Sequence, residues 1–432
     1  MIYELHVSST ESELFKDKIN TWFLDSPRDP TSYTSDSSIQ IKGWLLSKNS
    51  EDAVFLILEN DELKMRHEVS LPRRDVIEEV LSQEVTSGLF LNCGFDFGFP
   101  SIGGVIDISF EINGQLYPVR TININQASNV LVGIRDWLFL DNDSNRSVDQ
   151  YCGELLISEH ELDRWRQYLK STHSMISDIE SRWVLLIAPS KEYVVPQYFP
   201  YKQGENSTAH QLLEECERVN APVLYPLQIL NSESELTYTK GDTHWTDYGA
   251  LIACNEIVQF FGIETLEASR IPYFQFAKRL GDLGTKLSPP QYHTEFVANF
   301  SSTASKLSFD NGIHNHGRIW TFDNPSATLK STAVIFGGSS SNNMAQWLSM
   351  FFSRLVFVHT AGGIDQSILL QEKPDYVIAQ TNARFTITAP PTSVDVRETI
   401  REKISKMNNS DRENLEKHLS VQEKSPYAIW GR

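Results

Sequence analysis

The sequence is poor in cysteine and has no long apolar run. Its four cysteines, Cys93, Cys152, Cys216 and Cys254, have no CxxC spacing and lie in apolar or helical patterns, so we expect free, buried thiols. No apolar run approaches the ~18 residues that a membrane-spanning helix requires. The first residues also lack a basic segment followed by an apolar core, the pattern of a secretory signal. We therefore expect a cytoplasmic protein without a transmembrane segment, associated with membranes only through partners.

Positive charge is also scarce. The 38 lysines and arginines are outnumbered by 56 aspartates and glutamates, which gives a formal net charge of −18. Nucleic-acid binding and docking on anionic lipids both depend on basic side chains, so this balance argues against both. No local basic patch that would suit a polyanionic substrate stands out. The hydrophobic content of 40% and charged content of 22% are those of an ordinary globular protein, and 432 residues suggest two domains.

The first part of the chain has the pattern of a small antiparallel β-sandwich. Between Ile39 and Ile124, short runs alternate between apolar and polar residues, which is typical of strands with one buried face. Asn113 and Gly114, between two of these runs, are a strong hairpin-turn signal. We predict an N-terminal β-sandwich domain over residues 1–128. It could serve for packing or could bind a glycan, and the sequence leaves both roles open.

Beyond residue 129 the pattern alternates between strands and helices. Residues 130–140 predict a strand, a tight turn and an aromatic-rich strand, and the spacing of Ser158 and Glu161 predicts a capping box that starts a long helix. The continuous apolar run at 183–188 is typical of a parallel strand buried on both faces. Further strands are predicted at 222–227, 333–336, 355–359 and 376–380, further helices at 211–218, 247–261 and 343–352, and irregular loop at 264–324.

This alternation predicts an α/β fold, a three-layer sandwich, over residues 129–393. The remaining residues, 394–432, are rich in charged side chains and have a helical pattern. We expect them to form a helical tail that flanks the second domain in contact with solvent.

A serine follows one of the predicted strands. The short apolar strand runs through Gly337 and Gly338 into Ser339, and a helix pattern follows. This places the hydroxyl at a helix N-terminus, where backbone N–H groups and the helix dipole favour a developing oxyanion. Alternatively, Ser339 is only a helix N-cap, because serine is among the preferred residues there. Ser340 and Ser341 are neighbours that could be confused with it.

An aspartate and a histidine, Asp242 and His244, stand two positions apart just before a predicted helix. A serine hydroxyl is a weak nucleophile until a base accepts its proton, and the imidazole base needs a carboxylate that fixes its tautomer. With Ser339, the pair predicts a nucleophilic triad in the chain order Asp, His, Ser. The alternatives are a helix cap, a structural histidine, or a metal pair, for which only His314 and His316 offer further ligands.

Six segments that include these residues occur in a characteristic order. They are Gly133–Leu140, Ala188–Tyr193 with Tyr198–Pro200, Gly241–Thr246 with Gly249, Gly281–Gly284, Phe336–Ser341 and Pro374–Ile378. Together they resemble the alginate O-acetyltransferase family, of AlgJ and AlgX type. The first two segments resemble its first strand and its Pro-x-Lys strand end, and the third and fourth resemble its Asp-x-His-Trp signature and the loop that follows. The last two resemble its Gly-x-Ser block and its last core strand. The resemblance covers about residues 130–385.

The resemblance implies an SGNH-like acyltransferase fold whose triad order is permuted. By position, Ser339 is implied to be the nucleophile, His244 the general base and Asp242 the residue that orients the base. The residue before the serine is Gly338, where many SGNH proteins have aspartate. We expect the backbone N–H of Ser339 to hold the oxyanion, with Asn382, which follows a core strand, as a second donor; Asn382 could instead be a turn residue.

Four further residues are candidates for binding the substrate. They are Trp245, Lys191, Tyr193 and Trp137, which lie in or beside the motifs above. The two tryptophans could stack on sugar rings, although core packing is the commoner fate of either one.

These features predict a polysaccharide O-acetyltransferase that moves an acetyl group through an acyl-serine to a sugar hydroxyl of a bacterial surface glycan, such as a capsule. We expect acetyl-CoA as the donor, because the expected compartment is intracellular, and neither a permanently bound cofactor nor a metal. The expected partners are the glycan acceptor and other proteins of polysaccharide biosynthesis. Two alternatives stay open: a carbohydrate acetylesterase with the same triad, and a non-catalytic glycan-binding protein.

Overall fold

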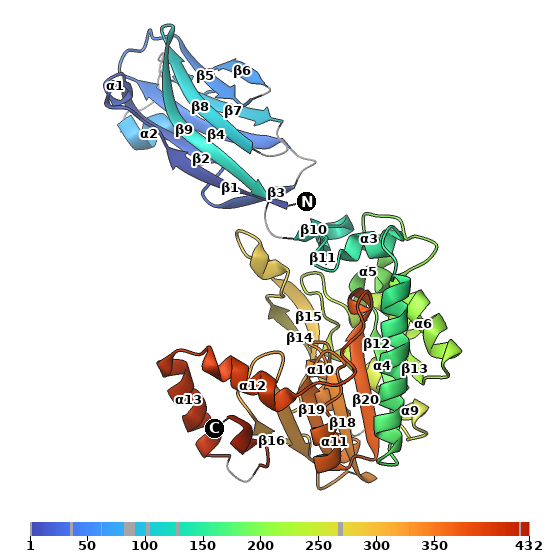
Figure 1. Ribbon diagram of the computed structural model, residues 1–432. Coiled ribbons are helices and arrows are strands. Elements are labelled where there is room, and N and C mark those ends of the chain that lie inside the picture. Colours follow the sequence, from blue (N-terminus) through green and yellow to red (C-terminus); the bar gives the residue numbers. More distant parts are fainter. Residues whose placement is uncertain are drawn as a thin grey trace. The chain divides into compact units, whose positions relative to one another are not determined.

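The computed structural model describes residues 2–34, 38–61, 63–81, 91–100, 104–126, 129–266, 271–327, 329–422 and 425–431. The chain is a mixed α/β protein with several sheets, and it divides into two compact units (Figure 1). The first unit comprises Met1–Val132 and Asp282–Gln291, and the second comprises Gly133–Gly281 and Tyr292–Arg432. The predicted boundary at residue 128 lies outside the described residues. No described helix combines the length and the apolar character needed to cross a membrane.

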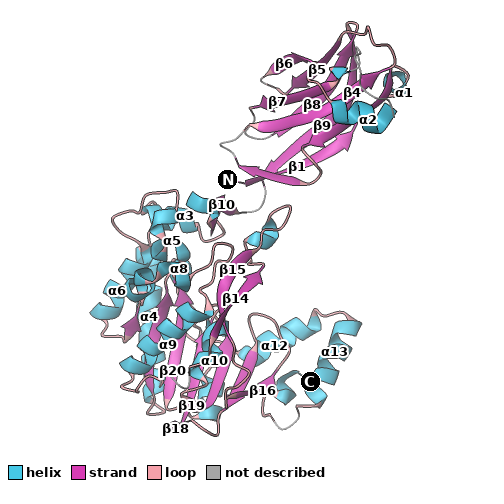
Figure 2. Ribbon diagram, turned by 180° about the vertical axis from the view of Figure 1, so that it is seen from behind, coloured by secondary structure: helices cyan, strands magenta, loops and turns pink. Residues whose placement is uncertain are grey.

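The first unit is built from two antiparallel sheets. Figure 2 shows its strands in magenta and its short helices α1 and α2 in cyan. The strand orders are β3-β1-β9-β8-β5-β6 and β2-β4-β7. The elements are β1 (Ile2–Ser9), α1 (Glu13–Lys16), β2 (Ile19–Ser26), β3 (Thr31–Thr34), β4 (Ile39–Ser47), β5 (Val54–Glu59), β6 (Lys64–Glu68), α2 (Arg74–Leu81), β7 (Gly94–Phe99), β8 (Gly104–Ile112) and β9 (Gln115–Gln126), followed by β10 (Val130–Val132).

The two sheets share one apolar core. Trp22 of the smaller sheet meets Phe110 of the larger one with ring centroids 5.3 Å apart. The hairpin between β8 and β9 turns at Asn113 and Gly114, whose φ angles of 50° and 82° are left-handed. The predicted turn is thus present, because asparagine and glycine tolerate that backbone conformation.

The second unit contains a seven-stranded sheet in the order β13-β12-β20-β18-β19-β17-β16. Its strands are β12 (Arg182–Ala188), β13 (Val223–Leu224), β16 (Lys306–Asp310), β17 (Ile319–Asp323), β18 (Leu329–Gly337), β19 (Phe352–His359) and β20 (Tyr376–Asn382). The first five strands of this order are parallel, and β17 and β16 are antiparallel. The apolar run of β12 is buried along almost its whole length, as the sequence predicts for a parallel strand covered on both faces.

Helices cover both faces of this sheet. Apolar side chains of α4 (Glu159–Ser177), α6 (Thr208–Arg218) and α11 (Gln366–Glu372) share a core with alternate residues of the central strands. The helices α9 (Asp247–Phe260) and α10 (Ser341–Leu348) pack together, and α10 contacts β18 and β19, but their side chains lie outside that core. They therefore lie on the opposite face.

The described part of the second unit also contains several further elements. They are η2 (Ile134–Asp136), β11 (Leu138–Leu140), α3 (Ser147–Cys152), α5 (Lys191–Val194), η3 (Pro196–Tyr198), α7 (Leu227–Ser232), α8 (Ser234–Thr237), β14 (Phe274–Arg279), β15 (His293–Ala298), η6 (Ala383–Phe385), α12 (Val396–Ser405), α13 (Asn409–Ser420) and η7 (Ala428–Gly431). The element η5 (Gly284–Lys286) belongs to the first unit.

Several predicted elements differ from the structure. The described part of the segment 264–324, predicted as loop, contains four strands. No continuous apolar run marks β14, and none of its side chains is buried. The strand at 222–227 is reduced to two residues because α7 begins after Pro226. The capping box is half formed: the Ser158 hydroxyl accepts from the Glu161 N–H, whereas the Glu161 carboxylate accepts from the Ala389 N–H.

The C-terminal tail is helical but is not merely a solvated flank. Val396 and Ile400 of α12 and Leu415 and Leu419 of α13 are buried in the core of the second unit, together with Trp430. The many charged residues of these helices suggest exposure to solvent. The buried face is not evident from the local sequence, because its burial depends on a neighbouring surface formed by other parts of the chain. The second unit accordingly extends to the end of the chain.

Candidate active site

The candidate residues lie where strands and helices of the second unit meet. Ser339 lies two residues after the end of β18 and two before the start of α10, so it stands at the carboxyl edge of the parallel sheet. Asp242 and His244 lie in the loop that leads into α9. Thr246 caps that helix by accepting the N–H of Gly249 at 3.1 Å, which fixes the end of the loop.

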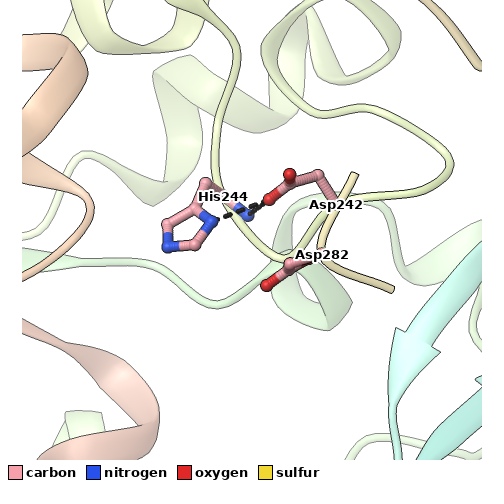
Figure 3. Close-up of side chains that lie close together, drawn as sticks. All are labelled: Asp242, His244 and Asp282. Atoms are coloured by element: carbon pink, nitrogen blue, oxygen red, sulfur yellow. Dashed lines mark hydrogen bonds and ion pairs between the residues drawn. The ribbon is translucent and has the colours of Figure 1, made fainter. Parts of the chain in front are cut away.

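The structure brings the three predicted residues into one hydrogen-bonded chain. The Ser339 hydroxyl lies 2.7 Å from Nε2 of His244. Nδ1 of His244 in turn lies 2.7 Å from Oδ1 of Asp242, as Figure 3 shows for these two side chains. The same carboxylate oxygen also accepts the backbone N–H of His244 at 2.8 Å. A carboxylate can only accept, so Nδ1 carries the proton and Nε2 is free to accept from the serine. This is the arrangement in which a histidine can activate a serine hydroxyl.

The chain of three residues opens into a pocket of about 360 Å³. Its walls come from the loop before α9, from β14 and β15, and from the start of α10; besides the three residues they include Thr239, Trp245, Thr246, Asp247, Arg279, Leu280, Gly281, His293, Glu295, Val297, Asn342 and Asn343. The pocket is large enough for a small polar group or a sugar unit.

Two carboxyl groups in the pocket wall have raised pKa values. Burial raises the pKa of Glu295, and the nearby charge of Asp242 raises it further, whereas Arg279 opposes the effect. Burial also raises the pKa of Asp247, although that carboxylate accepts the N–H of Ala298 at 2.9 Å. In both cases burial disfavours the ionised form of the carboxyl group.

Several of these wall residues escape prediction from the sequence. Arg279, His293 and Glu295 lie on β14 and β15, in the stretch predicted as loop, and no motif marks them. Asn342 and Asn343 carry a usable signal, because they follow Ser339 by three and four positions at the start of a predicted helix.

Asn382, predicted as an oxyanion donor, does not line the pocket. Its Oδ1 accepts from the Ser340 hydroxyl at 2.9 Å and from the Gln380 amide at 2.8 Å. Oε1 of Gln380 in turn accepts the N–H of Gly338 and the hydroxyl of Ser341, both at 2.8 Å. The side chains of Asn382 and Gln380 thus hold the turn around Ser339 in place, which is a positioning role.

Lys191 is not a substrate-binding residue in this geometry, because its side chain is only 3% exposed. Its Nζ donates to the carbonyl oxygens of Leu138, Lys240 and Asp242 at 2.6, 3.1 and 3.0 Å. The ammonium group therefore joins β11 to the loop that carries Asp242. Sequence alone could not show this role, because a lysine is usually solvated.

Three aromatic candidates are also buried. Trp137 stacks on Tyr198 with ring centroids 4.7 Å apart, and Tyr193 donates its hydroxyl to a backbone carbonyl. Neither lines the pocket, so the core-packing alternative is correct for Trp137. Trp245 does contribute to the pocket wall, but its indole N–H donates to the carbonyl of Ser340 at 2.9 Å and its ring is 2% exposed. It therefore offers little surface for stacking on a sugar.

His314 and His316 do not support the metal alternative. In the part of the chain that the structure describes, neither of them joins Asp242 and His244 in a group with metal-ligand spacing. Nδ1 of His314 instead lies 3.1 Å from the guanidinium of Arg318.

Replacing Lys191 by methionine should weaken both the fold and the site. Lys191→Met keeps the volume but leaves three carbonyl groups without their charged donor, so we expect the free energy of unfolding to fall by about 3 kcal/mol. We also expect kcat/KM to fall by about 10- to 100-fold, because the Asp242 loop loses its tether. Denaturant unfolding and steady-state kinetics measure the two effects. Lys240→Met, an exposed lysine with a single carbonyl partner, is the matched control; equal effects in both variants would contradict the tethering role.

Glu192, next to Lys191, predicts a pH-dependent stability. Burial raises the pKa of Glu192 from 4.5 to about 7. Between these values the folded chain binds a proton that the unfolded chain has lost, so the wild-type protein should lose about 3 kcal/mol of unfolding free energy as pH rises from ~4.5 to ~7. Glu192→Gln should remove this loss, whereas Glu154→Gln, at an exposed position, should not. Urea unfolding across this pH range tests it; parallel curves for wild type and Glu192→Gln would refute it.

Neither models of protein families nor curated proteins match this sequence. Several solved structures are similar to it. PatB1 from Bacillus cereus, with a sulfonyl adduct, has 13% identity and a TM-score of 0.46, with 62% of this chain and 97% of that chain covered. The O-acetyltransferase domain of AlgJ from Pseudomonas putida has 16% identity and a TM-score of 0.42, with 64% and 100% covered. AlgX from Pseudomonas aeruginosa has 14% identity and a TM-score of 0.38, with 60% and 64% covered.

Proposed function

We propose that this protein is an acyltransferase that uses Ser339 as its nucleophile, on an SGNH-like α/β fold with the permuted triad order Asp242, His244, Ser339. The observation that carries the proposal is the pair of 2.7 Å contacts that join hydroxyl, imidazole and carboxylate at the edge of an open pocket. A helix cap needs no such chain of side chains, and a structural histidine needs no contact with a serine beside a pocket.

The reaction follows from the proton positions. Nε2 of His244 accepts the proton of Ser339 while the serine oxygen attacks the carbonyl carbon of the acyl donor, and Asp242 stabilises the imidazolium that forms. The backbone N–H of Ser339 and the start of α10 favour the oxyanion. The protonated histidine then gives its proton to the leaving group, which leaves an acyl-serine.

The second half of the reaction uses the same groups. An acceptor hydroxyl enters the pocket, His244 removes its proton, and the hydroxyl oxygen attacks the acyl carbon of the acyl-serine. The bond from that carbon to the Ser339 oxygen then breaks, the protonated His244 returns the proton to Ser339, and the acylated acceptor leaves. We propose acetyl as the acyl group, acetyl-CoA as its donor, and a sugar hydroxyl of a bacterial surface glycan as the acceptor. The polar wall of the pocket supports a hydroxyl-rich acceptor. A cytoplasmic location in contact with other polysaccharide-biosynthesis proteins is part of the same proposal.

Labelling and product analysis test the function. Incubation with a sulfonyl fluoride should modify Ser339, and mass spectrometry of the digested protein should place the adduct on that residue. Incubation with acetyl-CoA and an oligosaccharide should add 42 mass units (the replacement of a hydrogen by an acetyl group) to the sugar. Release of free acetate alone would instead indicate an esterase, in which water takes the place of the sugar hydroxyl. A folded protein with an unreactive Ser339 would indicate a glycan-binding protein and end the proposal.

A further inference from the structure

A cluster of basic side chains lies beside the candidate site in an otherwise acidic chain. The basic cluster consists of His314, His316, Arg318, His359 and Lys403. The first three belong to the loop before β17, His359 ends β19, and Lys403 belongs to α12. The net charge of −18 makes such a local concentration of basic side chains informative.

Short contacts hold the basic cluster together. Nζ of Lys403 donates to the carbonyl of His314 at 2.6 Å, and the Arg318 guanidinium lies 3.1 Å from Nδ1 of His314. The rings of His316 and His359 meet edge to face with centroids 5.1 Å apart. Nε of Arg318 also donates to the carbonyl of Ile313 at 3.2 Å, so the loop fixes the direction of the guanidinium.

The five basic side chains have no acidic partners among the described residues. Within the described ranges, no carboxylate oxygen lies within 4.0 Å of a nitrogen atom of the five side chains. The groups influence one another instead: burial lowers the pKa of His359 to about 4, helped by the charges of His316 and Arg318, and burial and Arg318 lower the pKa of Lys403. The lowered pKa leaves His359 neutral near pH 7, so the positive charge of the cluster comes from Arg318 and Lys403, and an anion would stabilise it.

The interior side of the cluster also has unused polar groups. Nδ1 of His359 and Oγ1 of Thr360 are buried without a hydrogen-bond partner among the described residues. Buried polar atoms are normally paired, and exceptions call for an explanation such as a missing ligand or water. Arg318 is partly exposed as a residue, and its planar guanidinium has the fork geometry that matches a phosphate.

The basic cluster is connected to the candidate nucleophile. A guanidinium nitrogen of Arg318 lies 3.4 Å from Oδ1 of Asn342, which lines the pocket. The N–H of Asn342 donates to the carbonyl of Ser339 at 3.1 Å. The N–H of Thr360 donates to the carbonyl of Gly337 at 2.9 Å, which places the end of β19 against the turn that carries the serine.

We propose that the basic cluster binds a phosphate group of a substrate whose reacting end occupies the Ser339 pocket. This inference rests on the proposed function and specifies its substrate class. The phosphate could belong to a nucleotide-linked acyl donor such as acetyl-CoA, or to a phosphate ester on the glycan acceptor. Both present the same doubly charged oxyanion to Arg318 and Lys403.

Calorimetric titration of the full chain tests this inference with CoA, N-acetylglucosamine 1-phosphate and inorganic phosphate as probes. We expect a phosphate ester to bind, inorganic phosphate to compete with it, and Lys403→Gln to raise its Kd about tenfold through the loss of one charge-assisted contact. His316→Gln, at an exposed position, should weaken binding in the same direction. The matched control is Arg401→Gln on the same helix, an exposed cation that already faces Glu398 at 3.5 Å; it should bind like wild type.

The probes distinguish the sources and the failures. Tight binding of CoA assigns the cluster to the donor, and tight binding of the sugar phosphate assigns it to the acceptor. Binding of neither probe, or equal Kd values in Lys403→Gln, His316→Gln and Arg401→Gln, overturns the inference. No turnover is needed for these measurements. If Ser339 reacts with the sulfonyl probe but the protein binds no phosphate, the proposed function stands and the phosphate site is wrong. If the protein binds phosphate but Ser339 is unreactive, the phosphate site stands and the proposed function is wrong.

Discussion

Replacement of Ser339 by alanine should lower kcat by about 10⁴-fold or more, because the variant has no oxygen that can form the acyl-enzyme. The Ser339 side chain is only partly buried, and alanine fits the same turn, so the fold should persist. Acetyl transfer from acetyl-CoA to an oligosaccharide, followed by mass spectrometry, measures the loss. The same variant should no longer be labelled by a sulfonyl fluoride.

Ser340→Ala is the matched control for this prediction. Ser340 is the next residue in the same turn, but its hydroxyl donates to Asn382 and not to His244. We expect it to keep activity within about tenfold of wild type, with a loss of about 1 kcal/mol in stability from the missing hydrogen bond. If Ser340→Ala abolished activity and Ser339→Ala did not, the nucleophile would be misassigned.

Replacement of Asp242 by asparagine should lower kcat by about 10³- to 10⁴-fold. An asparagine amide can present either its oxygen or its NH₂ group to the ring. The NH₂ orientation would place the proton of His244 on Nε2, where it can no longer accept from Ser339. The volume is unchanged, so KM should change much less than kcat.

Two further measurements separate this effect from simple damage to the loop. The backbone N–H of His244 donates to the same Asp242 oxygen as Nδ1 does, so the NH₂ orientation also removes this hydrogen bond, and the unfolding free energy should fall by about 1 kcal/mol. The sulfonyl probe should react with Ser339 far more slowly in Asp242→Asn than in wild type. Labelling at the wild-type rate would show that the carboxylate does not help to activate the serine.

Local sequence patterns were sufficient for much of the fold. The apolar run of β12, the Asn113-Gly114 hairpin and the cap of α4 each depend on neighbouring residues alone, so their signals are complete in the sequence. Where the local signal is weak, prediction fails. The strand β14 has no buried face, so its sequence carries no continuous apolar run. The helices α12 and α13 each have a few buried apolar residues among many charged ones, so the sequence does not show that one face is buried.

The sequence by itself determined which residues could perform the chemistry: a serine after a parallel strand, and an aspartate two positions before a histidine. Only the tertiary structure decided that the Ser339 hydroxyl and the His244 imidazole, 95 positions apart in the chain, lie 2.7 Å from each other. It also decided that the buried Lys191 joins two segments through backbone carbonyl groups, and that Asn382 holds the turn around Ser339 through Ser340. It also decided that His314, His359 and Lys403 share one basic cluster. The physical reason is that side-chain chemistry is local, whereas contacts and burial depend on the order in which strands are placed in the sheet.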